Sequence, residues 1–221
     1  MSKINSTRNG CRDVFHSFLV SDATYDGTLE IPVIQPSTQL PDRFISFSKA
    51  MHTTDYDQWV HFYEDDSCFE RIWSRPNYYL PRLRQFKGVI SPDFSLYRDM
   101  PLVMQQWNTY RGKALGHWWQ MQGIQVIPNV RTSDERTFPF SCYGVPQGSP
   151  ICMGTHGCLR TRADRELFKE GLRYVIRDRH PSCIIIYGAL PADIAIMLAE
   201  ARIKVIHFKS EFALSREKEG D

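Results

Sequence analysis

The stretch at residues 150–159 reads PICMGTHGCL. It begins as a short apolar run of the kind that forms a buried strand, and this run stops on polar residues flanked by glycine. Gly154 and Gly157 permit backbone angles that are closed to other residues, so the chain can turn sharply there. We therefore expect a buried strand whose carboxyl end presents Thr155 and His156 to a cavity.

The same pattern recurs along the chain. Short apolar runs, rich in β-branched residues, end in polar or glycine residues and alternate with segments of helical periodicity. The other expected strands cover residues 44–47, 59–63, 88–90, 124–127, 183–187 and 204–208. Repeated strand–helix order predicts a parallel sheet covered by helices. Because polar clusters follow nearly every run, we expect a small or incomplete parallel β/α barrel (TIM-like), with an open doubly wound sheet as the alternative.

The longest expected helix begins after Pro101, with Asp99 as its N-cap. Apolar residues three or four positions apart define one stripe on it, which comprises Val103, Trp107, Tyr110, Ala114, Trp118 and Met121. Gly112 and Gly116 weaken this helix, and we expect a break there. Two later helices are expected, one after a Thr161 cap and one that Pro191 opens.

The length of 221 residues suits one well-buried domain. Residues 1–43 contain three prolines and are expected to form an irregular N-terminal arm or cap. Residues 44–212 form the single α/β domain, and residues 213–221 are a charged C-terminal tail that we expect to be mobile.

The composition is that of an ordinary globular protein, with 42% hydrophobic and 24% charged residues. A net charge of +2 excludes histone-like coating of nucleic acid but is compatible with a local basic groove. No apolar stretch approaches the roughly 18 residues of a membrane span, and the N-terminus lacks a signal-peptide core, so we expect a cytoplasmic protein. The six cysteines form no C-x-x-C pair, so neither a zinc ribbon nor a disulfide framework is indicated.

Three residues that follow different expected strands are the candidate catalytic groups. Asp93, in a turn stiffened by Pro92, can serve as nucleophile, general base or metal ligand, although an Asx-turn would also explain it. Arg131 offers a fork-shaped cation for phosphate or carboxylate, and His156 can transfer protons. Ligands of parallel α/β folds bind at the carboxyl ends of strands, so we expect these three side chains to share one cavity.

A second set of residues at strand ends is expected to bind substrate, and it comprises Asn129, Thr155, Ser95, Asp65 and Tyr187. No cofactor is indicated by a motif. The acidic run Glu64-Asp65-Asp66 resembles a site for a hard cation, but a solvated helix N-terminus gives the same pattern. We assign no metal ligand, and Asp65, Asp66 or Asp93 are the residues that could hold a divalent ion.

Several common enzyme signatures are absent from the sequence. It contains no G-x-x-x-x-G-K-[ST] phosphate loop, no G-x-G-x-x-G, no H-E-x-x-H and no G-x-S-x-G. An ordinary nucleoside triphosphatase, a Rossmann dehydrogenase and an α/β hydrolase are therefore disfavoured.

Five short motifs together resemble a family catalogued as domain of unknown function 4417. They are CRDVF at 11–15, EDD at 64–66, SPDFS at 91–95, IPNVR at 127–131 and GTHG at 154–157. The resemblance covers about residues 10 to 209 and departs from the expected pattern at Thr132, where an aromatic residue is expected. It implies a bacteriophage, prophage or mobile-element context, and hence a role in replication, nucleic-acid modification or evasion of host defence. It implies no catalytic residues.

The leading functional hypothesis is an enzyme, a hydrolase or transferase, that acts on a glycosidic or phosphoester bond of a nucleotide, nucleobase or nucleic-acid substrate in the host cytoplasm. Asp93 would be the catalytic carboxylate, Arg131 the phosphate clamp and His156 the proton-transfer group. The alternative is a non-catalytic protein that sequesters a nucleotide or inhibits a host defence protein. A DNA-binding replication accessory is less favoured, because the basic residues are dispersed and no helix-turn-helix pattern is present.

Overall fold

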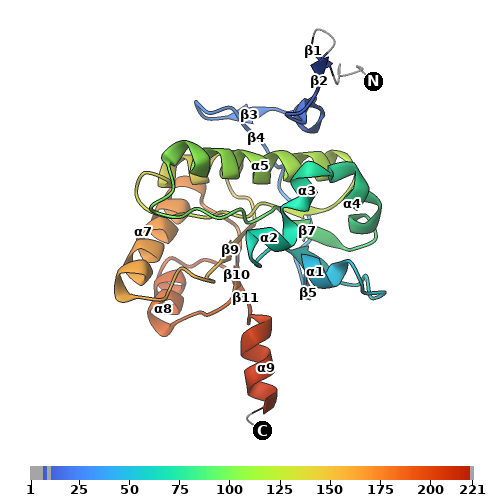
Figure 1. Cartoon of the computed structure of the whole chain (residues 1–221). Helices are drawn as coiled ribbons and strands as arrows, with labels where there is room; N and C mark the ends of the chain where they lie inside the picture. Colours follow the sequence, from blue (N-terminus) through green and yellow to red (C-terminus); the bar gives the residue numbers. More distant parts are fainter. Residues whose placement is uncertain (1–6, 9–10, 220–221) are drawn as a thin grey trace.

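Two parallel β-sheets lie at the centre of the molecule, and helices flank them (Figure 1). The computed structural model describes residues 7–8 and 11–219. The four-stranded sheet has the order β5-β6-β7-β8 and consists of Phe44–Ser46, Trp59–His61, Gly88–Ile90 and Val126–Ile127. The three-stranded sheet has the order β11-β10-β9, where β9 is Ile151–Gly154, β10 is Ile184–Tyr187 and β11 is Val205–Phe208. All seven expected strands are confirmed, and their pairing within each sheet is parallel.

The two sheets meet at one parallel bridge between Asn129 and Cys152. The amide of Val130 donates to the carbonyl of Cys152 at 2.9 Å, and the amide of Cys152 donates to the carbonyl of Pro128 at 3.0 Å. Strand order therefore follows chain order from β5 to β11, whereas a doubly wound sheet reverses its order at a switch point. Within the part of the chain that the structure describes, no backbone ladder joins β5 to β11.

One apolar layer lies across both sheets. Each of the seven strands contributes to it, through Phe44, Trp59, Ile90, Ile127, Cys152, Ile185 and Phe208. The rings of Phe44 and Phe208, on the first and last of these strands, lie with their centroids 4.3 Å apart. Successive residues of a strand face opposite sides, so the other residues of these strands pack outward against the helices.

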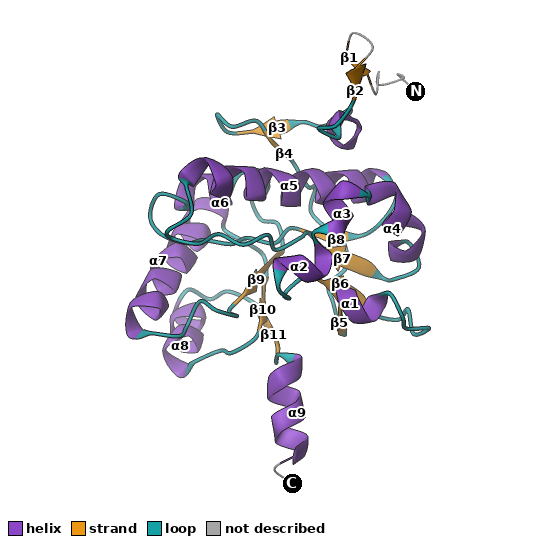
Figure 2. Ribbon diagram, in the orientation of Figure 1, coloured by secondary structure: helices purple, strands orange, loops and turns teal. Residues whose placement is uncertain are grey.

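The helices occupy the connections between strands (Figure 2). They are α1 (Phe47–Ala50), α2 (Asp66–Phe69), α3 (Arg71–Ser74), α4 (Pro76–Leu83), α5 (Leu102–Met121), α6 (Phe138–Ser141), α7 (Arg162–Arg179) and α8 (Ala192–Glu200). The expected cap of α7 is confirmed: the Thr161 hydroxyl accepts from the amide of Asp164 at 3.1 Å, and the Asp164 carboxylate accepts from the amide of Thr161 at 3.0 Å.

Helix α5 differs from expectation at both glycines and at its cap. Its N-cap is Pro101 rather than Asp99, and the helix continues without a break through Gly112 and Gly116. A Cβ on Gly112 would lie 2.8 Å from the carbonyl oxygen of Pro92. The missing side chain therefore lets the loop after β7 pass close to the helix, and this contact offsets the low helix propensity of glycine.

The apolar stripe expected on α5 is wrong for its last residue, Met121, which is exposed, and for the first half of the helix. Val103 and Trp107 are exposed, and the buried residues there are polar: Gln105, Asn108, Arg111 and Lys113. The reason is the loop between β7 and α5, whose backbone needs hydrogen-bond partners. Asn108 Nδ2 donates to the carbonyl of Ser95 at 2.7 Å, and Gln105 Nε2 donates to the carbonyl of Met100 at 2.9 Å.

The N-terminal segment packs on the outer side of α5 (Figure 1). It contains β1 (Thr7–Arg8), β2 (Cys11–Arg12), a 3₁₀ turn at Ser17–Val20, β3 (Tyr25–Asp26) and β4 (Ile31–Pro32). Two hydrogen bonds tie it to the helix: Gln120 Oε1 accepts from the Gln35 amide at 2.8 Å, and Gln120 Nε2 donates to the Gln35 carbonyl at 2.9 Å. Of the proposed arm, residues 1–6 and 9–10 lie outside the described residues.

The C-terminal segment forms a helix, α9 (Glu211–Glu219), where the sequence suggested a mobile charged tail. The Ser210 hydroxyl accepts from the amide of Ala213 at 3.3 Å, which is the N-cap arrangement. Lys49 forms an ion pair with Glu211 at 2.6 Å, and α9 then projects away from the body (Figure 1). The division into residues 1–43, 44–212 and 213–221 stays a prediction.

Candidate functional site

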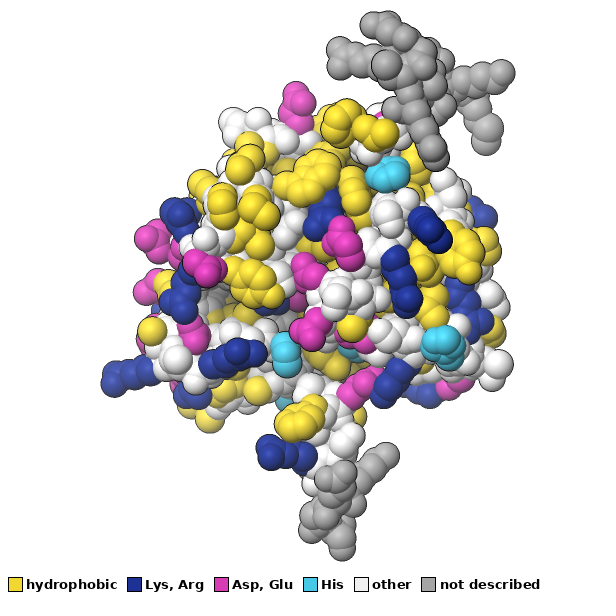
Figure 3. All heavy atoms as spheres, viewed as in Figure 1, with side chains coloured by type: hydrophobic (Ala, Val, Ile, Leu, Met, Phe, Trp, Pro, Cys, Tyr) yellow, Lys and Arg dark blue, Asp and Glu magenta, His cyan; other side chains and the backbone are white. Residues whose placement is uncertain are grey.

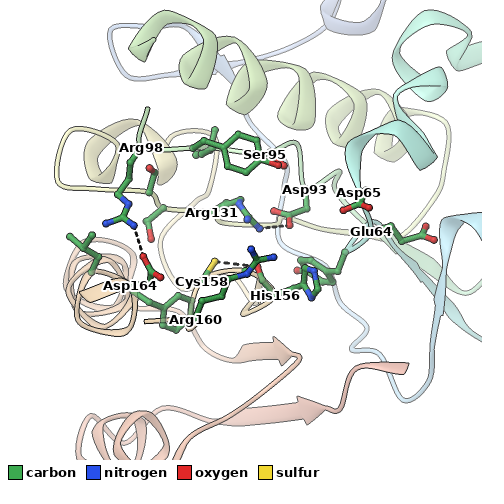
Figure 4. A pocket seen from close by; sticks show the side chains of 18 residues that line it. Glu64, Asp65, Asp93, Ser95, Arg98, Arg131, His156, Cys158, Arg160 and Asp164 are labelled. Carbon is green, nitrogen blue, oxygen red and sulfur yellow. Dashed lines mark hydrogen bonds and ion pairs between the residues drawn. The ribbon is translucent and has the colours of Figure 1, made fainter. Parts of the chain in front are cut away.

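A pocket of about 470 Å³ opens at the carboxyl ends of β6, β7, β8 and β9 (Figure 4). It is lined by Tyr63, Glu64, Asp65, Asp93, Ser95, Leu96, Tyr97, Arg98, Arg131, Thr132, Ser133, His156, Gly157, Cys158, Arg160, Asp164, Leu167 and Phe168. The three expected catalytic residues, Asp93, Arg131 and His156, therefore come from three different strand ends into one cavity. Its volume lies within the roughly 300–1,000 Å³ of small-molecule sites.

A buried ion pair lies at the centre of the pocket. Arg131 Nη1 donates to Asp93 Oδ2 at 2.7 Å, and Asn129 Nδ2 donates to Asp93 Oδ1 at 2.7 Å. The Asp93 side chain is 7% exposed and that of Arg131 is 17% exposed. Both carboxylate oxygens of Asp93 are thus engaged, and the carboxylate fixes the orientation of the guanidinium.

Burial and charge act in opposite directions on this pair. Burial raises the pKa of Asp93, while Arg131 and the hydrogen bond from Asn129 oppose that rise. Burial also disfavours the charged form of Arg131, but Asp93 and the neighbouring acidic groups outweigh it, so the pKa of Arg131 is raised. A guanidinium stays charged in proteins, so the pair holds a permanent cation beside a carboxyl group with a raised pKa.

Asn129 lies behind the pocket wall rather than in it. Its side-chain oxygen accepts from the Tyr63 hydroxyl at 2.9 Å, and its amide nitrogen is bonded to Asp93. The backbone of Asn129 is bonded as well, because its amide donates to Ser91 Oγ at 2.8 Å and its carbonyl accepts from Lys113 Nζ at 2.5 Å. Asn129 therefore orients Asp93, and direct contact with substrate stays a prediction.

Lys113 is a functional candidate that the sequence did not reveal. It projects from the middle of α5, is 3% exposed, and its pKa is lowered to about 7, chiefly by burial. A cavity of about 20 Å³, lined in part by Lys113, Asn129 and Arg131, lies between the helix and the ion pair. Lysine on a helix usually reaches solvent, so nothing in the residue pattern distinguishes this one.

His156 lines the pocket with an exposed side chain just after β9. The two glycines around it have different roles. Gly157 has φ +75°, as expected for the turn, whereas Gly154 does not adopt a positive φ. A Cβ on Gly154 would lie 2.5 Å from the ring of Tyr63, so this glycine allows the tyrosine to approach the strand end. The expectation of a special backbone angle at Gly154 was wrong.

The acidic residues after β6 separate into two roles. Glu64 and Asp65 line the pocket, and Glu64 Oε2 also accepts from the amide of Ser48 at 3.0 Å. Asp66 points to the neighbouring loop, where its Oδ1 accepts from the Ser95 hydroxyl at 2.8 Å. Ser95 lines the pocket with its hydroxyl already bonded to Asp66.

Two expected substrate-binding residues lie elsewhere. The Thr155 hydroxyl is buried and donates to the carbonyl of Tyr187 at 3.3 Å. The Tyr187 ring stacks on the Tyr63 ring at 5.0 Å, and its hydroxyl accepts from the amide of Glu211 at 3.4 Å. Neither residue lines the pocket, because both point into the packing between strand ends.

The pocket also contains residues that sequence reasoning missed. Arg98 Nη2 lies 2.5 Å from Asp164 Oδ1, and this ion pair spans the loop after β7 and the start of α7 (Figure 4). Arg160 and Cys158 follow the GTHG motif and line the same wall. The sequence could have indicated both residues, because they lie within three positions of the GTHG motif at 154–157. Thr132, the position at which an aromatic residue was expected, also lines the pocket.

The described residues contain no cluster of three or more His, Cys, Asp or Glu side chains arranged to hold a metal ion. Asp66 already accepts from the Ser95 hydroxyl, and Asp93 accepts from Arg131 and Asn129. None of the helices within residues 7–8 and 11–219 combines the length and hydropathy of a membrane-spanning segment.

The fold and the site define an α/β protein with parallel sheets and a polar pocket at the carboxyl ends of its strands. Residues 23–209 match the family described as "Domain of unknown function (DUF4417)", and the chain belongs to this family. The match begins after the CRDVF motif at 11–15 and includes the other four.

Two phage proteins are similar to this chain. The Gene 1 protein of Mycobacterium phage D29 is 33% identical over 189 residues, which cover 84% of this chain and 69% of the relative. The Gene 1 protein of Mycobacterium phage L5 is 34% identical over 189 residues, which cover 84% of this chain and 81% of the relative. No solved structure matches the chain. The expected phage context is confirmed, and neither relative's name states an activity.

Proposed function

We propose that the pocket is the active site of an enzyme that acts on a nucleotide, nucleobase or nucleic-acid substrate at a glycosidic or phosphoester bond. The observation that carries this proposal is the meeting of Asp93, Arg131 and His156 in one pocket of ligand size. A carboxylate, a cation and an imidazole in one cavity provide charge stabilisation and proton transfer, which both bond types require.

Each group has a distinct role in this proposal. Arg131 stabilises negative charge on the substrate, since its guanidinium has five N–H donors and Asp93 engages one nitrogen. His156 transfers the proton, because its imidazole is exposed in the pocket and can both donate and accept hydrogen bonds. Asp93 holds Arg131 in place and can accept further hydrogen bonds, since each carboxylate oxygen has two lone pairs.

The proposal extends to the arrangement of the strands around the site. We propose that the two sheets form one small, incomplete β/α barrel, interrupted between β5 and β11. Three observations support it: the sequential strand order, the apolar layer that all seven strands share, and the 4.3 Å contact between the Phe44 and Phe208 rings. In such barrels the active site lies at the carboxyl ends of the strands, which is where this pocket opens.

A second candidate function is capture of a nucleotide without turnover. The specific observation in its favour is that both oxygens of Asp93 are already bonded in the structure, to Asn129 and Arg131. A site whose charged groups are fixed in advance loses little entropy on binding, which suits tight sequestration.

One experiment separates the two functions. The purified protein is incubated with ribonucleotides, deoxyribonucleotides and short oligonucleotides, and the mixture is resolved by chromatography before and after denaturation. Released product supports the enzyme, and intact ligand recovered only after denaturation supports sequestration. The variant His156→Ala should reduce product formation by about 10²-fold or more. His52→Ala removes an exposed histidine outside this pocket and is the matched control. Equal activity of both variants would remove His156 from the mechanism.

A further inference from the structure

The charged side chains of the pocket are unevenly distributed. In Figure 4, Glu64 and Asp65 lie on one side, Arg98 and Asp164 lie on the opposite side, and the Asp93–Arg131 pair lies between them. Arg160 and His156 lie below that pair in the same view. A ligand in this pocket therefore meets the carboxylates of Glu64 and Asp65 at one end. Along the rest of its length it meets Arg160 and two ion pairs, Arg131–Asp93 and Arg98–Asp164.

The three arginines of the pocket, Arg98, Arg131 and Arg160, differ in the hydrogen bonds and ion pairs that they form with other protein groups. Arg98 is bound to Asp164, and Arg131 is bound to Asp93. Arg160 is exposed and forms no hydrogen bond or ion pair with the residues that the structure describes. Arg131 donates to Asp93 through Nη1, and its Nε is buried and has no hydrogen-bond partner among the described residues. Arg160 is thus the pocket arginine without a hydrogen-bond partner among the described residues, while Arg131 and Arg98 each donate through one nitrogen to one carboxylate.

Resting on the proposed function, we propose that the substrate is a free mononucleotide. Its phosphate binds Arg131 and Arg160, and the hydroxyl or amino groups of its nucleoside part donate to Glu64 and Asp65. Guanidinium groups match the geometry of phosphate oxygens, and carboxylates accept from hydroxyl and amino donors. The pocket volume of about 470 Å³ suits a single nucleotide rather than a chain.

The apolar surface of the pocket is consistent with this orientation. Leu96, Tyr97, Leu167 and Phe168 line it together with the charged groups, and Tyr97 is exposed. Small-molecule sites combine apolar walls with a few convergent polar groups. On the face seen in Figure 3, acidic and basic side chains are interspersed.

The test is calorimetric titration of the full chain with AMP, GMP, CMP and UMP and with the four corresponding nucleosides. We expect at least one monophosphate to bind, and to bind at least tenfold more tightly than its nucleoside. Arg160→Ala should weaken binding of that monophosphate about tenfold and leave binding of the nucleoside unchanged. Arg162→Ala is the matched control, since Arg162 is an exposed arginine two positions away that does not line the pocket. Asp65→Asn should weaken both ligands by the same factor.

Three results would overturn the assignment: no binding by any monophosphate, a nucleoside that binds as tightly as its monophosphate, or equal effects of Arg160→Ala and Arg162→Ala. A 5′-phosphorylated tetranucleotide that binds more tightly than AMP would also overturn it, because the phosphate would then belong to a nucleic-acid end. Failure of the enzyme proposal gives a different result from failure of the phosphate assignment. A monophosphate that binds as described and is recovered intact contradicts catalysis alone, whereas equal turnover of nucleoside and nucleotide contradicts the phosphate assignment alone.

Discussion

Arg131 and Asp93 are 38 positions apart in the chain, and they form a 2.7 Å ion pair at the base of the pocket. Asn129 adds a third group to this pair, and Tyr63 and Lys113 hold Asn129 from two other elements. The cation that we assign to phosphate binding is thus held by contacts from the segments that follow β6, β7 and β8 and from α5. This degree of support is expected of a preorganised site, since orientation fixed before binding lowers the entropy cost of binding.

Breaking this pair should destabilise the protein. Arg131→Met leaves Asp93 buried without its cation, and we expect the free energy of unfolding to fall by about 3 kcal/mol at pH 7. Asp93→Asn combined with Arg131→Met removes both charges and should recover much of the loss. Urea denaturation of the four proteins in this double-mutant cycle measures the coupling. Strictly additive effects would show that the pair contributes nothing as a pair.

Lys113 should give the protein a pH-dependent stability on the alkaline side of neutrality. Its pKa is lowered from 10.5 to about 7 by burial, so between these values the unfolded chain holds a proton that the folded chain has released. Stability from this group is therefore present above pH 10.5 and is lost as the pH falls toward 7. Between pH 7 and pH 10 the wild type should gain up to about 4 kcal/mol relative to Lys113→Met.

The measurement for Lys113 is the difference in unfolding free energy between wild type and Lys113→Met at each pH. The difference is needed because buried cysteines and tyrosines act in the opposite direction: burial raises the pKa of Cys152 and Tyr63, which lowers stability as the pH rises. Lys87→Met changes an ion-paired lysine at the surface and is the control. A wild-type minus Lys113→Met difference that stays constant across this range would contradict a lowered pKa.

His61 should make the protein sensitive to acid. It is 1% exposed, and burial lowers its pKa from 6.5 to about 3, with a smaller contribution from the charge of Lys49. The unfolded chain binds a proton on His61 as the pH falls below 6.5, whereas the folded chain does so only near pH 3. Stability is therefore lost across this window, by up to about 4 kcal/mol.

His61→Asn keeps an acceptor for the amide of Tyr63, which His61 Nδ1 provides at 3.2 Å. We expect this variant to lose less stability than the wild type between pH 6.5 and pH 4, as followed by thermal unfolding at each pH. The exposed His52→Asn is the control and should leave the slope unchanged. Identical slopes in the wild type and His61→Asn would show that His61 does not remain neutral in the folded state.

Gly112→Ala should be destabilising even though alanine favours helices. The new Cβ would lie 2.8 Å from the carbonyl oxygen of Pro92 and would displace the loop that carries Asp93. Overpacking typically costs about 1–3 kcal/mol, which outweighs the gain of about 1 kcal/mol in helix propensity. Gln106→Ala on the same helix is the control. Thermal unfolding measures both, and a stabilised Gly112→Ala would show that the loop moves freely.

Local patterns in the sequence were enough to locate the seven strands and helices α5, α7 and α8. The seven apolar runs became seven parallel strands, and Thr161 caps α7 as expected. These features depend on neighbouring residues, because burial of a short strand and capping of a helix are decided within a few positions. The same logic placed Asp93, Arg131 and His156 at strand ends, since parallel strands end at a common edge.

Other features were decided only by the tertiary structure. The buried face of α5 is polar because the loop after β7 lies against it, and the helix sequence alone cannot reveal this neighbour. Thr155 and Tyr187 point into the packing between strand ends, whereas Arg98 and Arg160 line the pocket. The backbone conformation of each loop sets these directions. The sequence alone thus determined which segments form strands and that polar residues lie at the carboxyl ends of those strands. Contacts between residues far apart in sequence decided which side chains share the cavity, since only the folded chain sets their distances and burial.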